Sequence, residues 1–461
     1  MKVLLMGLDV GTTSIKAVLF DDEGRALAEG RADTPWMVTA MGVQLDAAEL
    51  VVAAKSALAG ALDRRPGGSV AALGITSMGE SGVLLDSANV PLAPVIAWHD
   101  TRDASELDYL RSAVPDDAFA VKTGLPLRAQ WSLTKHKWLM RHVPESRGAV
   151  MRLNMAEWIA FSLGAAPVSE LSLASRTGWF DLSGRTWWDE ALEWSGANKG
   201  LMPELVTAGS DLGVVSPQAG LSRLEGAVIT VAGHDHQAAV AGTGAFRPGD
   251  ALDSCGTAEA LVRIIDPRLD AATLVELTRA GITAGWSVFE NKWTLLGGTQ
   301  GGLTLQSILS LLGSGSGDVA RLDAARGRVN PNEIQVETDD KGSTTIKGIT
   351  PSAEPADVWQ AALEEVTREA KEIDDAMVRA AGGHSRFVVT GGWSRSAGLL
   401  RTKERVFGPL DLTPVSEAGA RGAALFGGLA AGIYSSVYDF PGYAGLVRAE
   451  SGLDRLERKA S

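Results

Sequence analysis

The chain has 461 residues, a net charge of −13, 45% apolar residues and 21% charged residues. That length can bury two hydrophobic cores, and the acidic balance argues against nucleic acid as a partner. No apolar run reaches the roughly 18 residues of a membrane span, no cleavable leader is recognisable, and the single cysteine, Cys255, rules out a disulfide framework. These features predict a cytoplasmic protein of two globular domains that binds neither nucleic acid nor membrane.

A hydroxyl-rich turn lies near the start of the chain. Apolar runs predict strands at residues 3–8, 15–20 and 25–29. Between the first two strands, Gly11 lets backbone N–H groups approach an anion closely, and Thr12 and Thr13 can donate hydrogen bonds to it. Asp9, where the first strand ends, offers the oxygen ligands that suit hydrated Mg²⁺. This turn therefore predicts a metal–polyphosphate site, although an ordinary hairpin turn could have the same residues.

A second carboxylate stands where another strand meets a helix. Residues 227–232 predict a buried strand, and a helix of small residues is expected at 238–244. Asp235 lies between them and is well placed to act as a general base, although a helix N-cap aspartate would occupy the same position.

Two further glycine turns follow in the second half of the chain. Residues 251–265 place Gly256 and Thr257 between apolar stretches, and this repetition of the first turn suggests two similar halves. A strand at 387–390 ends in Gly391–Gly392 before a helix, and a helix N-terminus after glycines can bind an anion or a nucleotide.

No flexible linker divides the chain. We expect a first domain at 1–243, a second at 244–433, and a tail at 434–461 with a polar helix near 446–458. Within the second domain we expect an exposed glycine–serine loop at 313–317, two short strands joined by a turn at 337–347, and a long helix at 356–380 whose apolar stripe belongs to the core.

Other segments, in order along the chain, carry a family resemblance together with these turns: 74–86, 94–102, 123–127, 134–139, 154–158 and 174–177. With them the chain resembles the FGGY carbohydrate kinases, which include the glycerol kinases and xylulokinases and belong to the actin-like ATPase superfamily. The matches run from about residue 3 to 433. The resemblance implies an α/β fold of two actin-like (RNase H-like) ATPase domains, with ATP, Mg²⁺ and a small sugar or polyol in the cleft between them. A homodimer is left open.

The resemblance also implies roles for single residues. It makes Asp235 the catalytic base that accepts the substrate hydroxyl proton, and it associates both Asp235 and Asp9 with Mg²⁺. The nucleotide contacts implied are Gly11, Thr12, Thr13, Gly256, Thr257, Gly301, Gly302, Gly391 and Gly392. The sugar contacts implied are Met78, Gly79, Glu80, Trp98, Asp100, Gln130, Asp235 and His236.

Charge near the sugar site guides the choice of substrate. Glu80 stands where glycerol kinases have a glutamate, but Gly79 stands where they have an arginine, which argues against glycerol. Because Glu80 and Asp100 would repel an acidic sugar, we expect a neutral pentulose such as xylulose, or a small polyol, phosphorylated on a terminal hydroxyl. Arg102 and Arg128 could reverse this expectation by pairing a carboxylate.

Two alternatives remain open at this point. One is a kinase for a sugar acid or a hexulose, and the other is a nucleotide-gated binding or regulatory protein of the same superfamily. Residues 330–350 also depart from the family, because short strands are expected there in place of a long loop.

Overall fold

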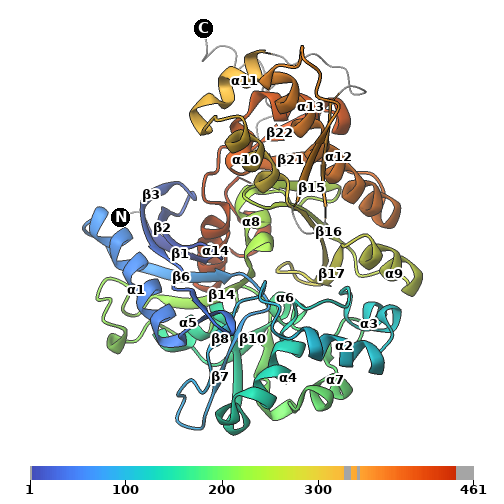
Figure 1. Cartoon of the computed structure of the whole chain (residues 1–461). Helices are drawn as coiled ribbons and strands as arrows, with labels where there is room; N and C mark the ends of the chain where they lie inside the picture. The colour runs from blue at the N-terminus through green and yellow to red at the C-terminus, as the bar shows by residue number, and fades with distance from the viewer. Residues whose placement is uncertain (1–2, 326–333, 340–342, 443–461) are drawn as a thin grey trace.

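The computed structural model describes residues 3–325, 334–339 and 343–442, and its main strands form two mixed sheets (Figure 1). The first sheet has the order β14-β6-β1-β2-β3. Its strands are β1 (Leu4–Val10), β2 (Ser14–Asp21), β3 (Ala26–Asp33), β6 (Val70–Ser77) and β14 (Val228–His234). β1, β2 and β3 form antiparallel hairpins, whereas β6 runs parallel to both β1 and β14. The carboxyl ends of β1, β6 and β14 therefore meet at one edge of the sheet.

The second sheet has the order β17-β18-β16-β15-β21-β22. Its strands are β15 (Asp250–Cys255), β16 (Glu259–Ile265), β17 (Thr283–Trp286), β18 (Trp293–Thr299), β21 (Arg386–Thr390) and β22 (Leu410–Leu412). Here too an antiparallel hairpin, β15–β16, carries a Gly-Thr turn, and a later strand, β21, runs parallel to β15. The two similar halves predicted from the repeated turn are confirmed by this topology.

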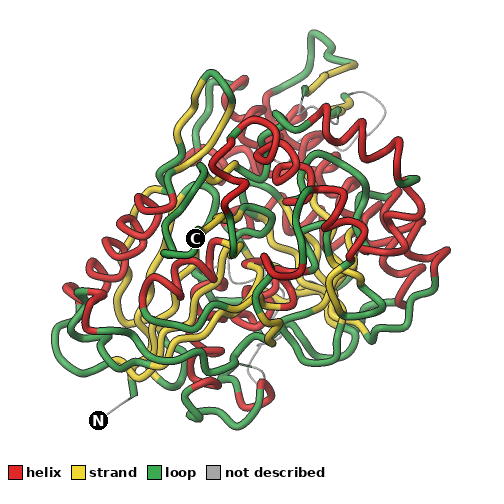
Figure 2. The backbone as a smooth tube through the Cα atoms, turned by 90° about the horizontal axis from the view of Figure 1, so that it is seen from below, coloured by secondary structure: helices red, strands yellow, loops and turns green. Residues whose placement is uncertain are grey.

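Helices and short strands surround these sheets. In the first half they are β4 (Met37–Thr39), β5 (Gly42–Leu45), α1 (Ala47–Arg64), β7 (Gly82–Leu85), β8 (Val95–Ile96), α2 (Ala104–Ala113), α3 (Asp116–Thr123), α4 (Ser132–His142), β9 (Met151–Asn154), α5 (Met155–Leu163), β10 (Val168–Glu170), α6 (Leu171–Ala174), β11 (Phe180–Asp181), β12 (Thr186–Trp187), α7 (Asp189–Ser195) and β13 (Glu204–Val206). In the second half they are α9 (Ala271–Arg279), α10 (Gly301–Leu311), α11 (Val319–Ala325), β19 (Gln335–Thr338), β20 (Thr344–Lys347), α12 (Pro355–Ala381) and α13 (Ala397–Phe407). Figure 2 shows strands running through the interior with helices on both flanks.

Two helices of small residues, α8 (Asp235–Thr243) and α14 (Ala418–Ala430), lie between the two sheets (Figure 1). They pack against each other and share one core with strands of both sheets, through residues such as Leu5 of β1 and Leu252 of β15. The approach is close enough that glycine is required. A Cβ atom on Gly7 or Gly74 would overlap a carbonyl oxygen of α14, and one on Gly422 would overlap a carbonyl oxygen of α8.

α14 therefore packs against the first sheet, although its residues come late in the sequence. The division of the chain at residues 243 and 433 stays a prediction. The nine described residues after 433 are docked on the core: Tyr434 Oη donates to the carbonyl of Asp22 over 2.7 Å, and Phe440 packs against Phe426. The helix predicted near 446–458 lies outside the described residues.

The long helix predicted at 356–380 is confirmed as α12, and Trp359, Val366 and Met377 on its apolar stripe are buried. The two short strands predicted around 337–347 are β19 and β20, and residues 340–342 of their turn lie outside the described residues. The expected 313–317 loop ends in a short 3-10 helix, Ser316–Asp318. Where the structure describes the chain, it contains no helix that is both long and apolar enough to span a bilayer.

Candidate active site

The edge where β1, β6 and β14 end brings two carboxylates together. Asp9 is the penultimate residue of β1, its neighbour across the parallel pair is Thr76 of β6, and the next strand, β14, ends beside Ser77 and leads directly into Asp235. The hydroxyl of Thr76 donates to the carbonyl of Gly233 over 2.6 Å and ties β6 to the end of β14. Ligand sites commonly lie at the carboxyl ends of strands in α/β sheets.

Burial raises the pKa of Asp9 to about 7, and the nearby charge of Asp235 is the next largest cause. Its Oδ1 is buried and has no hydrogen-bond partner among the described residues. Gly419, at the start of α14, leaves room for the carboxylate, since a Cβ atom there would overlap Asp9 Oδ2. Asp9 is thus a partly buried acid whose enclosed Oδ1 is still free to bind a ligand.

Asp235 is the first residue of α8, and the N-cap position belongs to His234. The N-cap interpretation of Asp235 is therefore wrong. Burial raises the pKa of Asp235 to about 7, partly offset by a 2.6 Å bond from the His236 backbone N–H to Oδ1. The nearby charge of Glu80 raises it further. Burial lowers the pKa of both His234 and His236, so both rings are neutral at pH 7.

Glu80 follows β6 and has a φ of 69°, which is unusual for a residue with a side chain. Its buried carboxylate accepts from Arg176 Nε at 2.5 Å and from Gln130 Nε2 at 3.2 Å, both on Oε1. Gly79 before it is tightly surrounded, because a Cβ atom there would press on Arg176 and on the ring of His234. Backbone strain of this kind is typical of functional sites.

A pair of arginines accompanies Glu80. The guanidinium carbons of Arg128 and Arg176 lie 5.3 and 5.5 Å from the ring centre of Trp131. Arg176 pairs with Glu80, but within the described ranges no acidic side chain pairs with Arg128. Arg102 and Arg128 were the arginines expected from the sequence to pair a carboxylate. The partner of Glu80 is instead Arg176, which lies 96 positions away in the sequence.

Asp100 is already bonded in the structure. Arg102 donates to its Oδ1 from both the backbone N (2.9 Å) and Nε (2.8 Å), and the backbone N of Val43 donates to its Oδ2 at 2.5 Å. These bonds outweigh the cost of burial and lower the pKa of Asp100. The hydrogen bond between Asp100 and a sugar hydroxyl stays a prediction. The hydroxyl would have to displace one of these donors or donate to the same oxygen beside it.

The predicted residues Thr12, Met78 and Trp98 do meet. Trp98 Nε1 donates to Thr12 Oγ1 over 3.0 Å, and the Thr12 hydroxyl points at the Met78 sulfur, 3.8 Å away. The Thr12 hydroxyl therefore contacts two residues that were predicted to bind the sugar, whereas Thr13 is exposed at the tip of the turn. The backbone of the turn is closed by a 3.1 Å bond from Gly11 N to the carbonyl of Ser14.

The three glycine segments predicted for the nucleotide in the second half of the chain converge on the second sheet. A Cβ atom on Gly302 of α10 would overlap the carbonyl oxygens of Gly256 and Thr257 and press on Trp393 Nε1. One on Gly391 would overlap the backbone of Cys255, and its φ of 96° also favours glycine. α10 begins at Gly301 as expected. After Gly391, however, a 3-10 turn (Gly392–Arg395) precedes α13.

Comparisons with known proteins agree with this arrangement. The model for the N-terminal domain of the FGGY family of carbohydrate kinases matches residues 4–242. The chain belongs to the FGGY family. This FGGY kinase is 30% identical to the glycerol kinase of Janthinobacterium sp. (strain Marseille), over 95% of this chain and 92% of that protein.

Solved structures of the family share the fold of this FGGY kinase. The xylulose kinase of Rhodospirillum rubrum has a TM-score of 0.81 and 24% identity, over 99% of this chain and 97% of that one. The glycerol kinase of Plasmodium falciparum, solved with ADP, has a TM-score of 0.85 and 18% identity, over 100% and 96% of the two chains. The expected two-domain α/β architecture is confirmed, and this chain is an ATP-dependent carbohydrate kinase.

Proposed function

We propose that this enzyme transfers the terminal phosphoryl group of ATP to a terminal hydroxyl of a small neutral ketose or polyol. The observation that carries the proposal is that Asp9 and Asp235 lie near each other where β1, β6 and β14 end, while three glycine segments converge on the second sheet. The substrate hydroxyl oxygen attacks the γ-phosphorus, its proton passes to the Asp235 carboxylate, and ADP leaves. The pKa of about 7 suits this role, because a general base works best when its pKa lies near the working pH.

The carboxylates also fit Mg²⁺, which prefers oxygen ligands and keeps several waters. Asp9 has a buried oxygen without a partner in the described part of the chain, and the nearby charge of Asp235 raises its pKa, a repulsion that a bound cation would relieve. Asp9, through water, and Asp235 would hold the ion. When bound, it would neutralise charge on the phosphates. The net charge of −13 makes such local neutralisation more important.

Two side chains near Asp235, those of Glu80 and His236, support a hydroxylated acceptor. Glu80 Oε1 is shared between Arg176 and Gln130, and its other oxygen has no partner in the residues described. The neutral His236 ring can both donate to and accept from a hydroxyl. With Gly79 in place of the arginine of glycerol kinases, these groups favour a pentulose such as xylulose over glycerol.

A second candidate, a sugar acid, has an observation of its own. Arg176 cancels the charge of Glu80, which removes the repulsion expected from the sequence, and Arg128 adds a guanidinium without an acidic partner among the described side chains. That arginine could pair the carboxylate of an aldonate. Membership of a kinase family favours either of these over the nucleotide-gated binding protein.

A substrate panel tests the proposal. Release of ADP would be measured with pentuloses, hexuloses, polyols, glycerol and aldonates at equal concentration, with Arg128→Gln beside the unmodified enzyme. The proposal expects turnover to be highest on a neutral pentulose or polyol and little changed by the substitution. If an aldonate is the best substrate and Arg128→Gln selectively weakens it, the sugar-acid candidate takes its place.

A further inference from the structure

A fully buried lysine connects the segments assigned to the nucleotide. Lys403, on α13, is 0% exposed, and its ammonium donates to Asp253 Oδ2 over 2.6 Å and to Glu259 Oε1. Asp253 belongs to β15 and Glu259 begins β16, so the two carboxylates flank the Gly256–Thr257 turn. Burial alone would lower the pKa of Lys403, but the nearby carboxylates raise it well above its ordinary value, so the side chain is charged.

The same hydrogen-bond chain reaches the other two glycine segments. The second oxygen of Glu259 accepts from Thr299 Oγ1 at 3.3 Å, and that hydroxyl accepts from the backbone N of Gly301 at 3.1 Å, where α10 begins. Lys403 itself lies on α13, the helix that follows Gly391–Gly392. One ammonium is therefore linked to the hairpin turn, to the start of α10 and to the helix after the glycine pair.

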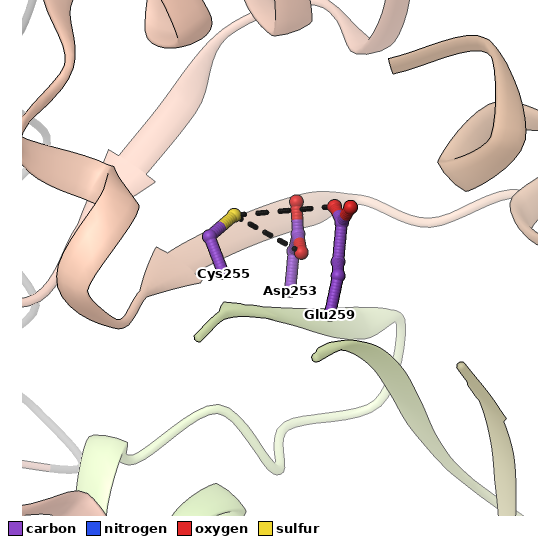
Figure 3. A group of neighbouring side chains, drawn as sticks. All are labelled: Asp253, Cys255 and Glu259. Carbon is purple, nitrogen blue, oxygen red and sulfur yellow. Dashed lines mark hydrogen bonds between the residues drawn. The ribbon is translucent and has the colours of Figure 1, made fainter. Parts of the chain in front are cut away.

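Figure 3 shows the acidic part of this cluster, with Asp253, Cys255 and Glu259 gathered on the hairpin. Cys255 Sγ lies 3.3 Å from Asp253 Oδ1 and 3.9 Å from Glu259 Oε1, and the possible ligand atoms lie within 4.8 Å of one another. Such a group could hold a metal ion, but the Lys403 ammonium already bonds to both carboxylates. The cluster is therefore an internal ion pair, and the cation it surrounds is part of the chain.

We propose that Lys403 is a positioning residue that holds the Gly256–Thr257 turn against α10 and the Gly391 turn, and so sets the affinity for the nucleotide phosphates. The inference rests on the proposed placement of the nucleotide on these segments. Without the ammonium, two buried carboxylates would face each other unpaired, and breaking a buried ion pair in this way is strongly unfavourable. The strands on either side of the turn would then separate or rearrange, and the backbone N–H groups of the turn would lose their alignment.

The test compares two ion pairs that involve β15: the fully buried pair of Lys403 and the partly buried pair of Arg386. Lys403→Gln removes the ammonium near the carboxyl end of β15. Arg386→Gln breaks the pair with Asp250 at the opposite end of β15 and β21, where Arg386 Nε lies 2.9 Å from Asp250 Oδ1. Mg-ADP would be titrated calorimetrically into each full-length protein, with thermal unfolding and the KM for the sugar measured alongside.

Lys403→Gln should weaken Mg-ADP binding by roughly 10- to 100-fold, which is typical when a supporting group is removed from a site, and should change the sugar KM little. Arg386→Gln should lower the unfolding temperature but leave Mg-ADP affinity within about twofold, because distant sites act independently. The triple variant Lys403→Met, Asp253→Asn, Glu259→Gln removes the repulsion without restoring the bridge. It should recover thermal stability but not Mg-ADP affinity.

Three results would overturn the role of Lys403: unchanged Mg-ADP affinity in Lys403→Gln, an equal loss in Arg386→Gln, or affinity that returns with stability in the triple variant. If Lys403→Gln does not fold, the triple variant decides. Failure of the unmodified protein to bind Mg-ADP would instead show that the proposed nucleotide placement is wrong, and the inference would fall with it.

Discussion

Replacing Asp235 with asparagine should remove most of the sugar phosphorylation and at the same time stabilise the folded protein. Asparagine keeps the size of the side chain and can still accept the bond from His236 N, but it cannot take the hydroxyl proton. A positioned general base typically contributes ~10²–10⁴ in rate, and that corresponds to about 3–5 kcal/mol in the activation barrier. The turnover number should therefore fall by that factor, while Mg-ADP binding should persist.

The stability part follows from the pKa of Asp235, which is raised to about 7 from an ordinary value of 3.8 by burial. The pKa of Asp235 is higher in the folded protein than in the unfolded chain, so the protonated side chain favours the folded state. This stabilisation is lost as the pH rises from 3.8 through 7. Three pKa units at 1.36 kcal/mol each give as much as about 4 kcal/mol of destabilisation in the unmodified protein at pH 8. Asparagine has no such loss.

Both parts can be measured on one preparation. Sugar-stimulated ADP release gives the turnover number, and guanidinium unfolding with EDTA present, at pH 5 and pH 8, gives the free energy of unfolding. The variant should gain stability relative to the unmodified protein at pH 8 and much less at pH 5. Turnover within a fewfold of normal would remove Asp235 as the base. An equal stability change at both pH values would refute the raised pKa of the Asp235 carboxylate.

Three other predictions concern the metal, the protonation of a buried histidine and the closure of the cleft. Asp9→Ala should raise the Mg²⁺ concentration needed for half-maximal turnover, and an unchanged Mg²⁺ titration would reduce Asp9 to a turn residue. Burial lowers the pKa of His136 to about 3, and the unfolded chain therefore takes up a proton first as pH falls below 6.5. From pH 6.5 to 5 the unmodified protein should lose about 2 kcal/mol of stability that His136→Phe keeps, as unfolding titrations would show, and parallel curves would contradict this. ATP and sugar together should reduce the radius of gyration in small-angle scattering, because the turns proposed to bind phosphate lie on both sheets, and identical profiles would argue against a two-sided site.

The parts of the site that could be predicted from the sequence depend on local signals. A strand followed by a glycine turn has a recognisable composition, and this placed Asp9 and Asp235 at strand ends before their neighbours were known. The boundaries were less exact. The helix expected to begin at 238 begins at Asp235. Its first turn could not be recognised from the sequence because it is polar and lacks an apolar periodicity.

Partner choice over long sequence distances could not be predicted. Arg176 reaches Glu80, and Lys403 reaches Asp253 from 150 positions away, only because the tertiary fold brings their elements together. The local sequence around an arginine or a lysine does not predict which carboxylate it will pair with. The expectation of a strongly anionic sugar pocket was weakened for this reason, since Glu80 is paired and Asp100 is held by Arg102.

The packing between the two sheets indicates which part of the cleft can move. α8, which begins with Asp235, contacts α14 so closely that a Cβ atom on Gly242 or Gly422 would overlap the backbone of the other helix. A rigid contact of this kind transmits displacement rather than absorbing it. Asp235 and Asp9, whose carboxylate lies against Gly419 of α14, should therefore move as one body with these helices. The Gly256–Thr257 turn lies at the end of the β15–β16 hairpin on the second sheet, outside the glycine contact between the two helices. If the turn binds the phosphates as proposed, closure of the cleft should bring it toward the two carboxylates.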